Sequence, residues 1–320
     1  MAYPVFSAND DPKIGESLMG FALRMSEANH FNGLNWLAKV FQVNRIHHLS
    51  SYHMPVIAWM FGSSPSLFNE ATADTHQLKG TLQVHAYGHV ITRSFLLRLR
   101  QPQVCPLCLE QFGCVKTIWD FSLITCCPLH GTTLVETCEG CGRKLNWGRP
   151  GIMTCRCGFD LRRTKVVQAH DHARCFAIWF SRRLPADNEI FAKNLSNYQS
   201  LALLDELSTD GAMRLLWAIG VHSTAQDLLT AGKARQALMT AMAQQCIVRG
   251  IKRLSEIYLH QNWTELRPTF VSSALHALAI DGLWEADRSI AAQFLTLGKL
   301  RENPKASLLH LNPLSQIKLF

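Results

Sequence analysis

The chain has 320 residues, of which 48% are hydrophobic and 18% are charged. This composition supplies enough apolar side chains for a folded core and excludes a globally disordered chain, and the length predicts two domains or one domain with an insertion. No apolar run approaches the ~20 residues that a membrane helix needs, and Asp10 and Asp11 stand where a signal peptide would be basic and then apolar. We therefore expect a cytoplasmic protein without a membrane contact, in which eleven cysteines indicate metal rather than disulfides.

Positive charge and cysteine are both concentrated in the middle of the chain. Residues 80–183 hold 14 Lys/Arg and 6 Asp/Glu, whereas residues 1–79 and 184–320 are close to neutral. Ten of the eleven cysteines lie between Cys105 and Cys175. These shifts predict three regions: a helical N-terminal region (1–79), a basic cysteine-rich module (80–183) and a helical C-terminal domain (184–320). The excess charge indicates either a polyanionic partner or a solvated basic surface.

The N-terminal region predicts two short helices. Residues 15–31 place apolar side chains at helical spacing, and a second apolar face follows at residues 34–41. Such a pair could be a DNA-reading helix-turn-helix or an ordinary helical hairpin. The second helix carries only Lys39 and, just beyond it, Arg45 as basic residues, which favours the hairpin.

Four close pairs of Cys or His residues follow one another in the middle of the chain. The pairs are Cys105/Cys108, Cys127/His130, Cys138/Cys141 and Cys155/Cys157. Structural zinc takes four Cys or His ligands, and each close pair can come from one tight turn, so eight ligands suffice for two closed tetrahedral sites. Gly142, Gly158 and the prolines at positions 106 and 128 suit such turns. We therefore predict two structural zinc ions per chain, which substitute for a core in a segment with few apolar residues of its own.

The spacing leaves two points of this metal prediction open. Sequential pairing joins the first pair to the second and the third to the fourth, whereas a cross-brace joins the first to the third and the second to the fourth. Cys126 could replace Cys127, although only Cys127 gives the C-x-x-H spacing. The other three cysteines are expected to be buried thiols: Cys114, Cys175 and Cys246.

The C-terminal third predicts further helices. Thr224-x-x-Asp227 is typical of a helix start, and apolar residues then recur up to Met242, in residues 249–259 and in Phe270–Ile280. We expect the methionines in the core and the cluster Arg249/Lys252/Arg253 on a solvated face. The fold class is then α+β and mostly α-helical, with the two zinc ions in a central ribbon module of short strands and turns.

Three stretches of the chain resemble the TniQ family, which is related to the TnsD target selectors of bacterial transposons. The first is Pro12-Lys-Ile-Gly-Glu-Ser-Leu18, with Phe21 and Arg24 behind it. The second runs from Arg93-x-Phe-Leu96 into Val104-Cys-Pro-Leu-Cys-Leu-Glu110. The third places the aromatic stretch Trp119-Asp-Phe121, expected to be a strand, before Cys127-Pro-Leu-His-Gly131 and Cys138-Glu-Gly-Cys-Gly142. The resemblance covers about residues 12–160, and the Cys-x-Cys form of the last pair departs from it.

The resemblance implies a non-enzymatic, DNA-associated bacterial adaptor for transposition. Its implied partners are an AAA+ ATPase that regulates the transposase, an RNA-guided CRISPR effector complex, and DNA and RNA in the assembled complex. A second copy of the chain, in a homodimer, is a further candidate partner. The sequence contains no G-x-x-x-x-G-K-[ST], so an ATP-driven step would need a partner. The alternatives are a direct, sequence-specific DNA-binding target selector and a zinc-ribbon transcription regulator unrelated to transposition.

Two groups of residues are candidates for partner contacts. Basic residues around the last zinc ligands could contact nucleic acid or an acidic protein: Arg143, Lys144, Arg149, Arg156, Arg162, Arg163 and Lys165. The first helix, from Glu16 to Arg24, is expected near a partner contact, with Leu18, Phe21 and Met25 in the core. No residue is expected to be catalytic.

Overall fold

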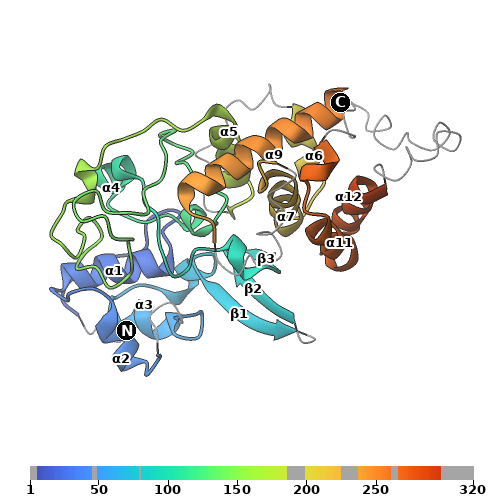
Figure 1. Ribbon diagram of the computed structural model, residues 1–320. Coiled ribbons are helices and arrows are strands. Elements are labelled where there is room, and N and C mark those ends of the chain that lie inside the picture. The colour runs from blue at the N-terminus through green and yellow to red at the C-terminus, as the bar shows by residue number, and fades with distance from the viewer. Residues whose placement is uncertain are drawn as a thin grey trace, which may run out of the picture.

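The computed structural model describes residues 6–44, 49–78, 81–185, 199–224, 237–260 and 266–296. In this part the fold is α+β and mostly helical, with one three-stranded sheet, which confirms the predicted class. Figure 1 shows the N-terminal helices beside a loop-rich region at one end of the molecule and the C-terminal helices at the other. Among the described helices, none combines the length and the apolar character that a bilayer span requires.

The elements are short except in the C-terminal region. The α-helices are α1 Leu18–Ala28, α2 Asn35–Val40, α3 Met54–Met60, α4 Pro106–Phe112, α5 Asp171–Ser181, α6 Gln199–Asp205, α7 Thr209–Gly220, α9 Thr240–His260, α11 Ser272–Asp281 and α12 Glu285–Thr296. The 3₁₀ helices are η2 Pro65–Phe68, η3 Ser94–Leu96, η4 Thr117–Asp120, η5 Leu161–Arg163 and η8 Arg267–Thr269. The strands are β1 Ala73–Leu78, β2 Thr81–Ala86 and β3 His89–Ile91.

Helix α1 is shorter at both ends than the predicted span 15–31. Gly15 has φ +67°, outside the helical region, and the Ser17 hydroxyl instead accepts a hydrogen bond from the backbone N–H of Gly20, so that Ser17 is the N-cap. Beyond Ala28 the chain reverses through His30 at φ +63°. The expected core face is confirmed, because Phe21 and Met25 are buried.

The three strands form an antiparallel meander in the order β1-β2-β3. Tyr87 and Gly88 connect β2 to β3, and both have positive φ, as two-residue hairpin turns require. The boundary expected between residues 79 and 80 lies outside the described residues, between two strands that pair with each other.

The N-terminal helices and the cysteine region share one buried core. The backbone N–H of Ser17 donates to the carbonyl of Val115 (3.0 Å), and that of Thr117 donates to Gly15 (2.8 Å). Gly20 permits this approach, because a Cβ there would lie 3.0 Å from the carbonyl oxygen of Val115. The start of α1 is therefore held directly against the cysteine region.

The cysteine region contains isolated bridges where short strands were expected. Bridges join Val104 to Val135 and Thr132 to Gln168. The aromatic stretch expected as a strand is instead the 3₁₀ helix η4, followed by a single bridge at Phe121. Tight turns at the cysteine pairs leave too few consecutive extended residues for a continuous ladder.

The C-terminal helices pack around α7 and α9. Figure 1 shows α9 running across the upper part of the molecule, above α7. The two helices approach closely at glycines, since a Cβ at Gly220 would lie 2.1 Å from the carbonyl oxygen of Cys246. Thr240 joins α9 to the cysteine region, where its N–H donates to the Glu136 carboxylate that also pairs with Arg98. Asp227 of the predicted helix start lies outside the described residues.

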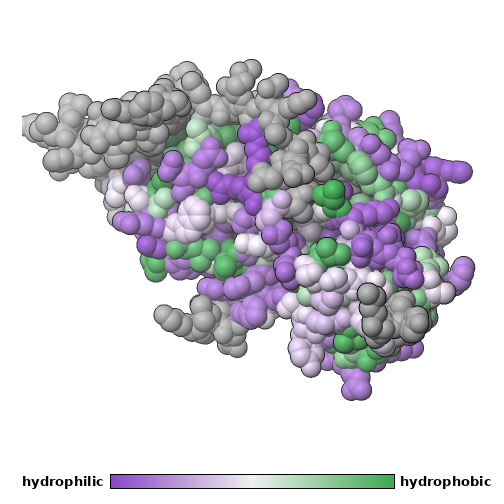
Figure 2. All heavy atoms as spheres, turned by 180° about the vertical axis from the view of Figure 1, so that it is seen from behind, coloured by the Kyte–Doolittle hydropathy of each residue, from purple (hydrophilic) through white to green (hydrophobic). Residues whose placement is uncertain are grey.

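Two expectations for the C-terminal helices are wrong. Arg249 and Arg253 do not lie on a solvated face, because their guanidinium groups donate to backbone carbonyls at the C-terminal end of α7. Met239 and Met242 do not lie in the core, since their exposed fractions are 46% and 54%. Hydrophobic side chains also reach the surface, since Val56 and Trp59 of α3 are exposed. Figure 2 shows hydrophobic residues scattered among hydrophilic ones on the rear face.

Candidate metal centre

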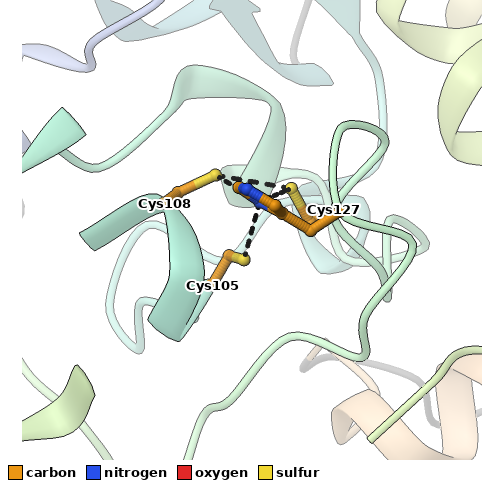
Figure 3. A group of neighbouring side chains, drawn as sticks. Cys105, Cys108 and Cys127 are labelled. Atoms are coloured by element: carbon orange, nitrogen blue, oxygen red, sulfur yellow. Dashed lines mark hydrogen bonds between the residues drawn. The ribbon is translucent and has the colours of Figure 1, made fainter. Parts of the chain in front are cut away.

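Four of the predicted ligands converge beside the start of α4. The sulfur of Cys108 lies 3.5 Å from that of Cys127 and 3.2 Å from Nδ1 of His130, and Nδ1 lies 3.5 Å from the sulfur of Cys105. Figure 3 shows the three cysteine sulfurs pointing toward one another. In a disulfide the two sulfurs are ~2.05 Å apart. Sulfurs that bind one tetrahedral zinc through ~2.3 Å bonds lie ~3.8 Å apart. The four side chains can therefore hold one metal ion.

The local backbone explains why these four side chains meet. Cys105 is the N-cap of α4, and Pro106 occupies its first turn, so Cys105 and Cys108 project from one helical turn. On the other side, the N–H of Gly131 donates to the carbonyl of Cys127 (2.8 Å). Gly131 has φ +67°, which closes the turn immediately after His130.

A second contact orients the imidazole of His130. Its Nε2 lies 3.1 Å from Oε1 of Gln111 on α4. An amide oxygen only accepts, so Nε2 carries the proton and Nδ1 presents its lone pair to the three sulfurs. The Thr132 hydroxyl lies 3.5 Å from the sulfur of Cys105. Sequence reasoning missed Gln111 and Thr132, because no ligand-type spacing marks them.

Cys127, and not Cys126, belongs to this group. Cys126 is fully buried beside it and bridges to Thr133 through its backbone. Burial raises the pKa of the Cys126 thiol, so it stays protonated and apolar. Adjacent residues in an extended segment point to opposite sides, which is why only one of the two can be a ligand.

The other four cysteines form a second group nearer the surface. The sulfurs of Cys138 and Cys157 lie 3.7 Å apart, and those of Cys141 and Cys155 lie 3.9 Å apart. These distances again match the edge of a tetrahedral site. Cys138 and Cys155 are buried, whereas Cys157 is exposed.

Both turns of the second group end in a glycine with positive φ. The N–H of Gly142 donates to the carbonyl of Cys138 (2.8 Å), and that of Gly158 donates to Cys155 (2.9 Å). Their φ angles are +67° and +86°. The short Cys-x-Cys pair therefore closes with the same hydrogen bond as the longer pair, although it has one residue fewer.

Within the second group the surroundings favour thiolate at Cys141, whereas burial raises the pKa of Cys138 to about 12. Hydrogen bonds from the backbone and side chain of Arg143 lower the pKa of Cys141 to about 6. A thiolate is the form that binds metal. The group thus has at least one ligand ready to bind at neutral pH.

The structure pairs the ligands sequentially. Cys105, Cys108, Cys127 and His130 form one group, and Cys138, Cys141, Cys155 and Cys157 form the other. The cross-brace alternative does not occur. The three remaining cysteines are buried free thiols, as expected: Cys114, Cys175 and Cys246.

Six of the seven basic candidates are exposed around the second group: Arg143, Lys144, Arg156, Arg162, Arg163 and Lys165. Arg162 pairs with Asp160 at 2.7 Å. The seventh assignment is wrong, because Arg149 is 1% exposed and donates to the carbonyls of Gly151 and Asn146. Burial lowers the pKa of Arg149 to about 10, and its guanidinium lies over the ring of Trp147. Arg149 therefore packs inside the fold.

Glu16 and Arg24, which are expected near a partner contact, pair with each other within the fold. Arg24 donates to both carboxylate oxygens of Glu16, at 2.9 and 2.8 Å, and pairs with Asp10 at 2.7 Å. Glu16 is 2% exposed. Its carboxylate also accepts from the backbone N–H of Lys13 (2.9 Å), so the pair fixes the segment before α1. Neither side chain is free to bind a partner in this structure.

A comparison with known protein families finds a match that includes the first cysteine group. No curated protein matches the chain at a significant level. Residues 9–134 match the TniQ family model, and this span contains α1, the sheet and the whole first ligand group. The resemblance seen in the sequence is confirmed there: residues 9–134 are similar to the TniQ family.

Proposed function

We propose that the chain is a target-selection adaptor of a Tn7-like transposition system, which bridges a targeting complex to an AAA+ ATPase. A TniQ domain implies a role in target selection for transposition. The observation that carries the proposal is that the TniQ match encloses the complete group Cys105, Cys108, Cys127 and His130. The targeting complex in the proposal is an RNA-guided CRISPR effector.

Each cysteine group holds one structural zinc ion in this proposal. The donor sets are three Cys with one His, and four Cys, which are common ligand sets of structural zinc. Four protein ligands fill a tetrahedral shell and leave no position for water or substrate. The metals then contribute to folding and to the shape of the domain rather than to a reaction.

The bridging role is tested by reconstitution with purified components. The metal-loaded chain is immobilised and offered the transposon's ATPase, with and without the RNA-guided complex. We expect ATPase retention that increases when the targeting complex is loaded. If the ATPase is retained under neither condition, the bridging role is wrong.

A second candidate, direct selection of a DNA site, is favoured by one observation. Six exposed basic side chains surround the second cysteine group. Phosphate contacts give affinity without sequence information, so the adaptor proposal predicts weak, strongly salt-dependent binding with no preferred sequence. Titration of duplex DNA at two salt concentrations distinguishes the candidates, because a tight, salt-tolerant complex with one sequence would support direct selection.

A further inference from the structure

An apolar groove of about 420 Å³ lies beside the first cysteine group. Its walls come from residues 12–14, before α1, from residues 112–119 and from the turn 127–129. Ile14 and Leu129 form apolar lips with exposed fractions of 67% and 39%. The volume is in the range of ligand sites, and it suits one or two large apolar side chains.

One of the residues that line this groove, Trp119, has an indole N–H without a hydrogen-bond acceptor in the part of the chain that the structure describes. Trp119 is fully buried, and its indole Nε1–H has no hydrogen-bond partner within the described residues. By contrast, the indoles of Trp147 and Trp179 donate to the Leu99 carbonyl and the Asp205 carboxylate, at 2.9 and 2.7 Å. An unpaired buried donor is unfavourable. An occupant that brings an oxygen acceptor would remove this penalty.

Two lysines place positive charge at the groove. Lys13 donates to the carbonyl of Phe112 (2.5 Å), and Lys116 donates to the carbonyl of Ile14, so each ties the two walls together. An ammonium has three donors, and each of these uses one on a neutral carbonyl. Neither lysine has an ion pair in the part of the chain that the structure describes. Carboxylates on an occupant would complement both.

We propose that this groove binds an acidic, apolar peptide segment of a protein partner. A Leu- or Phe-type side chain fills the groove, a peptide oxygen accepts from Trp119, and Asp or Glu pairs with Lys13 and Lys116. The apolar walls fit a peptide better than nucleic acid, whose phosphates match the exposed basic residues at the second cysteine group. That the partner belongs to the transposition machinery rests on the proposed function.

The groove also depends on the first cysteine group. Cys108 and Cys127 line it, so the wall that carries Leu129 is positioned by the same residues that would hold the metal. The test therefore uses the full, metal-loaded chain and checks metal content and melting temperature for every variant.

The experiment selects phage-displayed random 12-residue peptides on the wild-type chain, with counter-selection on the Lys13→Glu/Lys116→Glu variant. We expect enriched peptides that combine Asp or Glu with Leu or Phe. Fluorescence anisotropy with the best labelled peptide should show binding that is about tenfold or more weaker in the double variant. The matched control, Lys144→Glu/Lys165→Glu, reverses two exposed charges at the second group and should bind the peptide as the wild type does.

The substitution Trp119→Phe tests the contribution of the unpaired indole N–H by itself. It keeps an aromatic ring and removes the N–H, so peptide binding should weaken about fivefold. The melting temperature of the free variant should not fall below that of the wild type, because the substitution removes an unpaired buried donor and its energetic penalty. Equal binding by the wild type and Trp119→Phe would overturn the role of the indole.

Three outcomes of the binding experiments overturn the proposal, and a fourth comes from ATPase recruitment. One is a library in which no peptide distinguishes the wild type from the double variant. Another is a double variant that only loses self-association, which would assign the groove to a second copy of the chain. The third is a double variant that only loses binding of a labelled DNA duplex. ATPase recruitment that survives Lys13→Glu/Lys116→Glu overturns the groove and leaves the proposed function intact, whereas peptide binding without any recruitment does the reverse.

Discussion

At the scale of single residues, two adjacent cysteines have different environments. Cys127 converges with three other ligands, whereas Cys126 is an isolated buried thiol. We predict that Cys127→Ser loses one of two bound zinc ions and lowers the melting temperature, because a serine hydroxyl is a poor replacement for a thiolate ligand. Elemental analysis of the purified variant and a melting curve provide the measurement.

Cys126→Ala is the matched control for this prediction. It changes a neighbouring buried sulfur of the same size and should retain both metals, with a loss of about 1 kcal/mol from the small cavity. If Cys126→Ala loses a metal while Cys127→Ser keeps both, the assignment of the ligand is reversed.

Asp120 predicts a pH-dependent stability. It is 1% exposed and accepts a hydrogen bond from the Tyr87 hydroxyl, and burial raises its pKa from 3.8 to about 7. Because the folded state binds this proton more tightly, the stabilisation is complete below pH 4 and is lost as the pH rises to 7. Asp120→Asn removes the titration. The melting temperature of the wild type should therefore fall relative to Asp120→Asn between pH 5 and 7 and level off above pH 8, and parallel curves would contradict the assignment.

At the scale of elements, two arginines of α9 complete the end of α7. The last carbonyls of a helix have no partner within it. Arg253 donates to the carbonyls of Ile219 (2.6 Å) and His222 (2.8 Å), and Arg249 donates to that of Gly220 (2.9 Å). Positive charge at the C-terminal end of α7 also interacts favourably with the helix dipole. These contacts join α9 to the C-terminal end of α7.

We predict that Arg253→Met lowers the free energy of unfolding by about 1–3 kcal/mol, since buried carbonyls lose charged donors. Lys252→Met is the matched control, because Lys252 is exposed one residue earlier on α9. It should change stability by less than about 0.5 kcal/mol. Urea unfolding of both variants makes the comparison, and equal losses would show that the contacts do not matter.

The elements that the sequence predicted best are those whose signals are local. Apolar spacing located α1 and α11, and pairs of ligand-type residues located the four metal turns. The roles of Arg24, Arg149 and Arg253 could not be predicted, because each pairs with groups that are distant in sequence or hidden in a backbone turn. A charged side chain without a visible partner is ordinarily solvated, and that general rule failed at all three positions. Gln111 was missed for the same reason, since only the folded structure places it against His130.

At the scale of the whole molecule, the two metal groups differ in how far their ligands are exposed. The first lies in the core shared by the N-terminal helices and the cysteine region, with Cys105 and Cys108 at most 2% exposed. The second also places Cys138 and Cys155 in this core, but its ligand Cys157 is exposed. A shift in composition marked the cysteine region as a separate module, but composition carries no information on which helices share its core.

This asymmetry predicts that a chelator removes the metals in two steps. The exposed second group should release its zinc first, while the helices remain folded, because solvent and chelator reach Cys157 without disrupting the core. The first group should release its zinc only as the N-terminal region unfolds, since its ligands are covered by that region. Zinc release, followed with a chromogenic chelator together with circular dichroism, should show a fast phase without loss of helix and a slow phase that coincides with it. Cys157→Ser disables the second group and should retain only the slow phase. If both ions leave together with the helical signal, the two groups are one cooperative unit and the difference in ligand exposure has no energetic consequence.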